Sequence, residues 1–430
     1  MSENHNHETP HPGFKELTPI TEALRTIFGN LPHKAVGVEK VSLSLAVGRF
    51  LAEDVLSEID IPAFERSTKD GFAVIAEDTH GEEPAAPVCL RLVGAVQIGN
   101  IPTVRVSKGE AVSIITGGNM PHGANAVVMV EDTRKREDGT VEISREVSSG
   151  ENVTGKGEDV RNGSIVLRKG TRLLPQDIGM LTCLGLSQVS VKTRPKVAVL
   201  STGSELEAQP DPSSGKIPDV NRPTLISALR ELDCEPIDLG IVDDDFDKIR
   251  SKLEHGIKVA DIVLVTAGTS VGPRDMVPEI INSLGKPGTL VHGVAMRPAM
   301  PTGLAVVDEK PIISLPGFPV SAYIAFLELV RPLVAYMLGT DSLPRPTVKA
   351  RLSERVVGDP GSRIYVRVLV TSSRGGYIAR PIPASSSAIL SSLVQANGFV
   401  IIPENVEGYE EGQEVDAELF RPPEPGQAVR

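Results

Sequence analysis

Three glycine-containing turns follow three apolar runs in the middle of the chain. They are residues 201–205 (STGSE), 266–272 (TAGTSVG) and 314–319 (SLPGFP). Glycine lets the backbone approach an anion closely, and Ser and Thr hydroxyls add hydrogen-bond donors. In an open parallel sheet, ligands bind at the carboxyl ends of the strands, where such turns converge. Together the three turns predict a site for a phosphate-bearing ligand.

Carboxylates lie beside these turns. Glu205 follows the first turn, Asp275 follows the second, and Asp243, Asp244 and Asp245 follow another apolar run. Acids next to an anion site are expected where a divalent cation bridges them to phosphates. The three aspartates also have a simpler interpretation, because Asp is a favoured N-cap and a helix is expected from residue 246.

Two further polar stretches lie earlier in the chain. Residues 62–73 (PAFERSTKDGFA) place basic residues, hydroxyls and Asp70 in front of Gly71, and residues 155–159 (GKGED) end in Asp159. Asp-Gly is also typical of a β-hairpin turn. Each stretch alone is therefore compatible with a plain turn.

The elements that must position these residues change along the chain. From residue 196 to 338, apolar runs of strand length alternate with helical stretches of about 10–15 residues, which indicates βαβ units and a mostly parallel sheet. Residues 347–420 show short β-like runs instead, typical of a small barrel or sandwich. Residues 61–147 also predict a small β-domain, with runs at 87–95, 101–106, 111–116 and 125–131. A helix is expected over residues 15–30, and the acidic last 28 residues are interpreted as a solvated face and tail.

Composition narrows the class of protein. The 430 residues carry a formal net charge of −12, aromatics make up 3%, and basic clusters are short, such as residues 134–136. Proteins that bind nucleic acid usually present a basic face and stacking aromatics, so we expect no nucleic-acid partner. No apolar run reaches about 18 residues and no signal peptide is recognisable, so no membrane span is expected. Three widely spaced cysteines fit a reducing, cytoplasmic compartment.

The ordered set of motifs resembles the MoeA family of molybdopterin molybdenumtransferases, which includes the C-terminal part of gephyrin. The similarity runs from about residue 15 to residue 420. The matching stretches are residues 62–73, 116–128 and 150–159, followed by the three turns in the same order. Six motifs in order make this resemblance specific.

The resemblance implies a multi-domain α/β plus β protein with an elongated protomer. Independently of the resemblance, the polar residues 1–14 are expected to be a disordered tail, with a metal-binding tract at His5, His7 and His11 as the alternative. In the resemblance, residues 15–60 and 148–190 would form a discontinuous N-terminal domain, with an inserted β-rich domain at 61–147. A MogA-like, molybdopterin-binding α/β domain would span 191–340, and a C-terminal β-barrel 341–430. A homodimer is also implied, with its active cleft between the α/β domain of one protomer and the inserted region of the other. Molybdopterin adenylyltransferase and molybdoenzymes are further partners to expect.

The implied reaction inserts molybdenum from molybdate into the dithiolene of adenylylated molybdopterin. The pyrophosphate link is cleaved and AMP leaves, with Mg²⁺ as the implied cofactor. The implied catalytic residues are Asp70, Asp159, Glu205, Asp244, Asp275, Arg297 and Ser387. The implied metal ligands are Glu205, Asp244 and Asp275. The implied cofactor-binding residues are Ser67, Thr202, Gly203, Ser204, Gly268, Thr269, Ser270, Gly272, Pro316 and Gly317.

Several positions on the ligand side depart from the family pattern. The family's Lys/Arg-Pro-Gly-Lys-Pro is residues 297–301 (RPAMP) here, so that Met300 replaces a lysine. Another family lysine is replaced by Gly293, an asparagine by Phe318 and a glycine by Ala267. One cation of three remains, and a lost charge-assisted contact is worth roughly 1.5–3 kcal/mol. Lys216 and Arg274 are candidates to replace the missing cations.

These departures leave two alternatives beside a molybdate insertase. One is an insertase that prefers tungstate, and the other is a molybdopterin-binding or scaffold homologue with weakened catalysis. An unrelated nucleotide-binding α/β enzyme is disfavoured, because neither dinucleotide-binding nor P-loop spacing is present.

Overall fold

The protein is described from a computed structural model, which covers residues 17–32, 36–81, 87–267, 276–340, 343–383 and 386–426. The chain divides into two compact units: Glu39–Val191 form the smaller one, and Met1–Val38 with Lys192–Arg430 form the larger one. Helix α1 (Ile20–Gly29) lies in the larger unit, whereas the sequence grouped it with residues up to 60. The other domain boundaries stay predictions.

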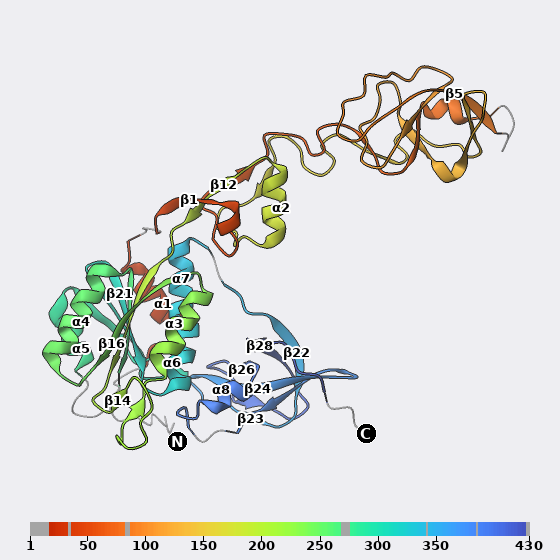
Figure 1. Cartoon of the computed structure of the whole chain (residues 1–430). Coiled ribbons are helices and arrows are strands. Elements are labelled where there is room, and N and C mark those ends of the chain that lie inside the picture. Colours follow the sequence, from red (N-terminus) through yellow and green to blue (C-terminus); the bar gives the residue numbers. More distant parts are fainter. Residues whose placement is uncertain are drawn as a thin grey trace, which may run out of the picture. The chain divides into compact units, whose positions relative to one another are not determined.

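A six-stranded sheet forms the centre of the larger unit, in the order β16-β13-β17-β21-β20-β18 (Figure 1). Neighbours β16, β13, β17 and β21 pair in parallel, and β20 pairs antiparallel with both β21 and β18. The predicted mostly parallel sheet is therefore confirmed. The strands are β13 (Lys196–Thr202), β16 (Glu235–Val242), β17 (Ile262–Ala267), β18 (Pro287–His292), β20 (Gly303–Val307) and β21 (Lys310–Pro316).

Helices cover both faces of this sheet (Figure 1). Helix α4 (Phe246–Val259) shows why: Ile249, Leu253 and Ile257 recur every four residues and are all buried. Burying such a side chain stabilises the fold by about 1.5–3 kcal/mol. Helices α4 and α5 lie on one face, and α3 and α6 on the other. The remaining bounds are α3 (Asn221–Glu231), α5 (Val277–Leu284), α6 (Pro319–Ala325) and α7 (Arg331–Leu338).

Helices α6 and α7 are joined by a π-helical segment (Phe326–Val330) into one long run. By length and composition alone this run, Pro319–Leu338, is the one described helix that could cross a membrane. It carries Glu328 and Arg331, so it is not an uninterrupted apolar run. In addition, 72% of its apolar window is buried inside the protein. The run therefore has the character of a core helix, whose apolar surface packs within the larger unit.

The C-terminal strands close into a five-stranded barrel, so the barrel is confirmed over the sandwich. The order is β24-β25-β22-β28-β26, and β26 pairs back to β24. The acidic end of the chain supplies β28, where Val415, Ala417 and Leu419 are buried while Glu414 and Asp416 are exposed. The interpretation of the last 28 residues as only a solvated face and tail was wrong, because alternating small and branched residues give this segment an inward face. The strands are β22 (Thr347–Leu352), β24 (Arg363–Ser373), β25 (Gly376–Pro381), β26 (Gly398–Ile402) and β28 (Glu414–Leu419).

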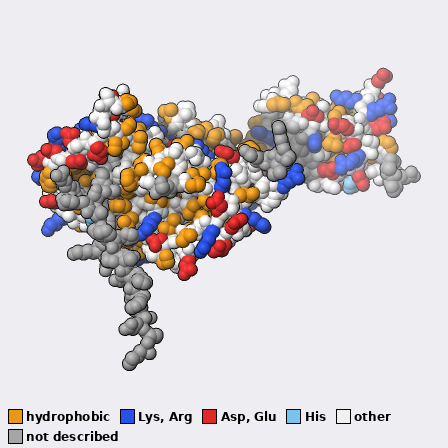
Figure 2. All heavy atoms as spheres, turned by 90° about the horizontal axis from the view of Figure 1, so that it is seen from below, with side chains coloured by type: hydrophobic (Ala, Val, Ile, Leu, Met, Phe, Trp, Pro, Cys, Tyr) orange, Lys and Arg blue, Asp and Glu red, His pale blue; other side chains and the backbone are white. Residues whose placement is uncertain are grey.

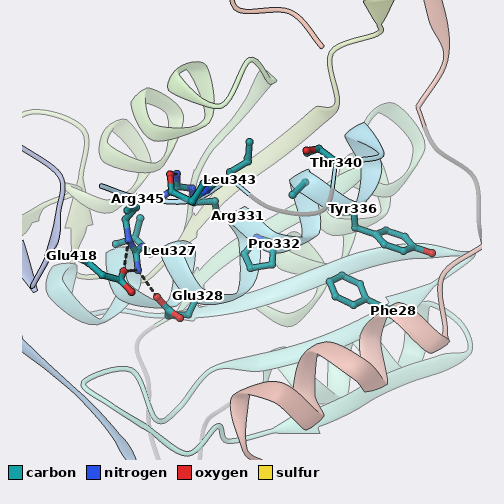
Figure 3. Close-up of a pocket in the computed structure, with 12 residues that line it drawn as sticks. Phe28, Leu327, Glu328, Arg331, Pro332, Tyr336, Thr340, Leu343, Arg345 and Glu418 are labelled. Carbon is teal, nitrogen blue, oxygen red and sulfur yellow. Dashed lines mark hydrogen bonds and ion pairs between the residues drawn. The ribbon is translucent and has the colours of Figure 1, made fainter. Parts of the chain in front are cut away.

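An ion-pair network joins the barrel to the long helix. Arg345 donates to Glu328 of the π-helical segment at 2.9 Å and to Glu418 of β28 (Figure 3). The Arg345 and Glu328 side chains are mostly buried, so this contact is screened less than a surface pair. Nearby, the rings of Phe28 on α1 and Tyr336 on α7 stack at 4.8 Å.

The smaller unit contains a second six-stranded sheet, in the order β7-β4-β6-β5-β9-β8. It confirms the predicted β-rich character, but the run at 101–106 is not a strand and makes only one bridge, Arg105 to His122. A second cluster in this unit packs α2 (Pro175–Cys183) against residues such as Leu51 and Val191. The sheet strands are β4 (Gly71–Val74), β5 (Val88–Ala95), β6 (Glu110–Ile114), β7 (Ala126–Met129), β8 (Thr133–Lys135) and β9 (Thr140–Ile143). The shorter strands are β1 (Val38–Ser42), β2 (Val55–Leu56), β3 (Arg66–Ser67), β10 (Val153–Thr154), β11 (Ile165–Leu167) and β12 (Gln188–Lys192).

Charged side chains of both signs are interspersed on the face shown in Figure 2, with groups of apolar side chains between them. The formal net charge of the chain is −12. An anionic ligand must therefore be held by local donors rather than by the general field of the protein.

Candidate functional site

The first predicted turn lies at the carboxyl end of β13, in the centre of the sheet. Thr202 is buried, and its hydroxyl donates to the carbonyl of Thr266 on the neighbouring strand at 3.3 Å. Gly203 has φ +151°, and a Cβ at this position would lie 2.7–2.8 Å from the carboxylate of Glu205. Glycine is therefore needed here so that Glu205 can fold back over the turn.

The three consecutive aspartates have three different roles. Asp245 caps α4 by accepting from the backbone N–H of Lys248 at 2.9 Å, and Asp243 pairs with the Lys248 ammonium at 2.8 Å. Asp244 instead accepts from the Ser204 N–H at 3.2 Å, while the Ser204 hydroxyl accepts from the Asp244 N–H at 3.0 Å. The capping interpretation holds for Asp245, and the ligand-side interpretation remains for Asp244.

A cavity of about 430 Å³ opens beside these turns. It is bounded by the ends of β13, β17 and β21, by the short strands β14 (Leu206–Glu207) and β15 (Ile217–Pro218), and by the segment before the barrel's small helix. The structure thus brings Thr202, Glu205 and Gly317 together with the C-terminal domain. The lining residues are Thr202, Glu205, Leu206, Ile217, Pro218, Asp219, Val220, Asn221, Thr266, Ala267, Gly317, Phe318, Pro319, Ala388 and Leu390.

Ser387 and the third turn meet at the start of α6. Phe318 occupies the N-cap position and makes no side-chain cap, as expected when a phenyl ring replaces an amide. The carbonyl of Ser387 accepts from the N–H of Val320 at 3.1 Å instead. A residue of the C-terminal domain therefore satisfies a helix donor beside the cavity.

Arg297 lies away from the cavity lining. Its Nε is 2.9 Å from Asp359 of the barrel, and both side chains are about 40% exposed. Ala299 follows with φ +98°, a conformation that favours glycine, so the family's glycine at this position has a backbone reason. The predicted residues Asp275, Gly268, Thr269, Ser270 and Gly272, together with Arg274, lie outside the described residues.

Asp70 is the better-defined carboxylate of the smaller unit. Its Oδ1 accepts from the Thr116 N–H at 2.7 Å and from the Thr116 hydroxyl at 3.0 Å. These two bonds, the backbone one first, lower the pKa of Asp70 below its usual value. Asp70 is exposed and ionised at neutral pH, which suits a residue that contacts a cation or a polar ligand.

Asp159 is exposed on a paired segment shared with the Asp70 turn. Residues 61–67 run antiparallel to residues 153–160: Ser67 faces Val153 in the β3–β10 pair, and Ile61 faces Val160. Asp70 follows the first pairing and Asp159 adjoins the second. The two carboxylates therefore adjoin different pairings of one two-stranded segment.

Ser67 has a supporting position. Its side chain is buried, and the hydroxyl donates to the Lys69 carbonyl at 2.5 Å while accepting from the Lys69 N–H at 3.2 Å. It fixes the turn that presents Asp70, and in this arrangement it has no free surface for a ligand.

Three family models match successive parts of the chain. "MoeA N-terminal region (domain I and II)" matches residues 18–185, "Probable molybdopterin binding domain" matches residues 198–336, and "MoeA C-terminal region (domain IV)" matches residues 349–420. A protein of Methanocaldococcus jannaschii named for molybdopterin biosynthesis is 33% identical over 95% of this chain and 99% of its own length. The chain belongs to the MoeA family.

Other MoeA-family relatives agree over the full length. The molybdopterin molybdenumtransferase of Bacillus subtilis is 33% identical, covering 94% of each chain. The crystal structure of the molybdopterin biosynthesis MoeA protein from Pyrococcus horikoshii OT3 superposes with a TM-score of 0.82 and 36% identity, over 94% of this chain and all of that one. The predicted family and fold class are therefore confirmed.

The described residues of this MoeA-family chain do not form a metal centre by themselves. No group of three or more His, Cys, Asp or Glu is placed to hold a metal ion within the described ranges. Of the predicted ligands, Glu205 lies over Gly203, and Asp244 is hydrogen-bonded to Ser204. The predicted magnesium site thus depends on Asp275 or on oxygens of the ligand itself.

Three residues of the site were not predicted from the sequence. Asn221 and Asp219 line the cavity, and Thr116 holds Asp70. Asn221 and Asp219 lie in a stretch (PDVN) that leads into helix α3, which is typical of simple capping. Thr116 lies in a stretch already matched to the family, where its position before two glycines was the available signal.

Proposed function

We propose that this MoeA-family protein is a molybdopterin molybdenumtransferase. It would insert molybdenum from molybdate into adenylylated molybdopterin and release AMP, as a step of molybdenum cofactor biosynthesis. The observation that carries the proposal is the cavity where Thr202, Glu205 and Gly317 meet the segment around Ala388, in a chain whose full-length relatives bear that name.

The chain's own groups suggest a division of work. Exposed carboxylates, Glu205 beside the cavity and Asp70 on the smaller unit, would orient the ligand and its counter-ion. The Ser204–Asp244 pair would keep the two strand-end loops in one arrangement. Preorganised polar groups of this kind lower a barrier because they need no rearrangement during the reaction.

The direct test uses the purified full-length chain with adenylylated molybdopterin, molybdate and Mg²⁺. We expect release of AMP and molybdenum bound to the pterin product, measured by chromatography and elemental analysis. We expect Glu205→Gln, which keeps the size of the side chain and removes its charge, to release AMP more slowly than the wild-type chain. Release no faster than in a reaction without protein would refute the proposal.

Magnesium dependence, a homodimer and a cytoplasmic location belong to the same proposal. The acids at the strand ends support a divalent cation, and the resemblance to the family supports the dimer. Activity lost with a chelator and restored by Mg²⁺ would support the cation. No step is assigned to a metal, since the described residues do not gather its ligands.

A weakened or tungstate-preferring homologue is the second candidate. No Lys, Arg or His is among the described residues that line the cavity, and Gly293 and Met300 stand where the family has lysines. Competing molybdate and tungstate in one reaction, with metal analysis of the product, separates the two insertases. Met300→Lys is the better restoring variant, because Gly293 has φ +96° and a side chain there would strain the backbone by about 1–3 kcal/mol.

A further inference from the structure

Arg297 lies on a loop at the ligand edge of the central sheet, although it does not line the cavity. Strand β18 pairs antiparallel with β20, and β20 pairs antiparallel with β21, so β18 and β21 run in the same direction. The loop that follows β18, residues 293–302, therefore leaves the sheet at the same edge as the turn that follows β21. In an open α/β sheet, ligands bind at this edge.

This loop is held from two sides by other parts of the larger unit. On one side, the backbone of Thr18 donates to the carbonyl of Gly293 at 3.1 Å and accepts from the N–H of Ala295 at 2.8 Å. On the other side, the short strand β19 (Met296–Arg297) pairs in parallel with β24 of the barrel. The C-terminal barrel therefore fixes the backbone of Arg297.

The barrel also contacts the side chain of Arg297, through Asp359 on a tightly held turn. The N–H of Ser362 donates to the Asp359 carbonyl at 2.9 Å, which closes the turn. Gly358 packs so closely that a Cβ there would lie 2.3 Å from the carbonyl oxygen of Val406. From this turn, the Asp359 carboxylate reaches to 2.9 Å from the Arg297 Nε.

The Arg297–Asp359 ion pair adds little to the stability of the fold, because both side chains are about 40% exposed. Its effect is on the arrangement of Arg297. An arginine side chain has many rotamers, and ordering it before a ligand arrives removes that entropic cost from binding. The guanidinium has five N–H donors in a planar fork, so a carboxylate at Nε does not by itself exhaust them. Such a fork suits the oxygens of a phosphate or a similar anion.

We propose that Asp359 is a positioning residue, which holds the Arg297 guanidinium in the orientation that binds a tetrahedral oxyanion. The inference rests on the proposed function, because it takes the substrates to carry such a group. The oxyanion is either molybdate or a phosphate of the adenylylated pterin, which share a tetrahedral arrangement of oxygens. Asp359 acts through Arg297 and does not contact the substrate.

The test titrates molybdate and AMP separately into the full-length chain by isothermal titration calorimetry. Asp359→Asn keeps the size of the side chain and removes its charge, whereas Asp359→Glu keeps the charge. We expect Asp359→Asn to bind at least one of the two anions about tenfold more weakly than wild type, and Asp359→Glu to recover most of the affinity. The anion that is affected identifies the source of the oxyanion.

The matched control is Asp416→Asn, which removes the acid of another exposed ion pair of the barrel, with Lys349. This variant should bind both anions as wild type does. Thermal unfolding checks that all variants are folded, and Asp359→Asn should unfold at nearly the wild-type temperature.

A double-mutant cycle separates positioning from a general structural effect. In Arg297→Gln the contact with the oxyanion is already lost, so adding Asp359→Asn should weaken binding no further. An equal further loss in that background overturns the inference. Unchanged binding by Asp359→Asn overturns it as well, as does tighter binding, which would mean that Asp359 competes with the anion. Wild type that binds neither anion has the same consequence.

The outcome is separable from that of the proposed function. AMP release by wild type, with both anions bound equally well by wild type and Asp359→Asn, removes the inference and leaves the reaction. Weaker binding by Asp359→Asn, in a chain whose wild type releases no AMP, keeps the positioning role and removes the reaction.

Discussion

Gly203 controls the position of the most exposed carboxylate at the cavity. We predict that Gly203→Ala displaces Glu205, because the new Cβ would lie within 2.8 Å of the Glu205 carboxylate atoms. AMP release should then fall at least about tenfold, the effect of one misplaced polar group. The matched control is Gly215→Ala, which also changes a glycine of positive φ but has open space around its Cα. Equal activity losses in the two variants would mean that backbone strain, not Glu205, is responsible.

Thr116 keeps Asp70 ionised to lower pH. We predict that Thr116→Val raises the pKa of Asp70 but leaves it below the usual value, because the backbone N–H, the larger cause of the shift, remains. A carboxyl whose pKa is lower in the folded than in the unfolded chain stabilises the fold at pH values above its pKa in the unfolded chain. This stabilisation is lost as the pH falls through its pKa in the folded chain. In the variant, the loss should therefore begin at higher pH.

Carbon-13 NMR titration of the Asp70 carboxyl measures this shift. Thr133→Val is the control, since the Thr133 hydroxyl donates to the Val130 carbonyl and not to an acid. An unchanged pKa in Thr116→Val would show that the hydroxyl contributes nothing.

The residues of the site differ in how far the sequence predicts them. Glu205 and Asp244 were predicted to lie beside the strand-end turns, and both do; their roles stay predictions. Ser67 was predicted to bind the ligand and Asn221 was not singled out, because the sequence does not show whether a hydroxyl or an amide bonds a ligand or the nearby backbone. Only packing decides: it turns Ser67 toward Lys69 and leaves Asn221 Oδ1 without a partner.

At the scale of elements, the three adjacent acids in the loop between β16 and α4 have three separate roles. We predict that Asp245→Ala lowers the free energy of unfolding by about 1 kcal/mol, as loss of an N-cap does, and leaves AMP release unchanged. Asp244→Ala should reduce AMP release while leaving the helix intact, because it frees the Ser204 loop. Asp243→Ala should change neither quantity measurably, since its partner Lys248 is exposed.

Urea denaturation and the AMP assay measure the two effects side by side. The same pattern of losses in all three variants would contradict separate roles.

The fold was predictable where periodicity is strong. The alternation of β13, β16, β17 and β21 with helices appeared in the sequence, because strands buried on both faces read as continuous apolar runs. Strand β28 was not predicted, because its exposed acidic residues drew attention away from the alternating buried residues on its other face. Residues 101–106 were wrongly predicted to form a strand, since apolar residues without a partner strand do not make one.

At the scale of the whole molecule, the proposed cleft between protomers can be tested by mixing variants. Asp70→Asn changes the smaller unit and Glu205→Gln changes the larger one. When equal amounts of the two variants associate at random, half of the dimers contain one chain of each. In such a dimer one of the two clefts has both wild-type residues. We therefore predict about a quarter of the wild-type activity. The two variants are refolded together or co-expressed to allow exchange.

The control mixture pairs Glu205→Gln with Asp244→Asn, which both lie in the larger unit. It should recover no activity under either arrangement of the cleft. No recovery in the test mixture would place each complete site within one protomer.

Helix α1 is synthesised long before the strands against which it packs. Its apolar side chains Ile20, Ala23 and Ile27 are buried in the larger unit, where α1 contacts β18 and β20. Strand β18 begins about 260 residues after α1 ends. At about 5–20 residues per second, the ribosome needs roughly 10–50 seconds to supply it. Throughout that interval β18 and β20, two strands that α1 contacts, have not yet been made. We therefore expect chaperones to act first on the apolar stripe of α1.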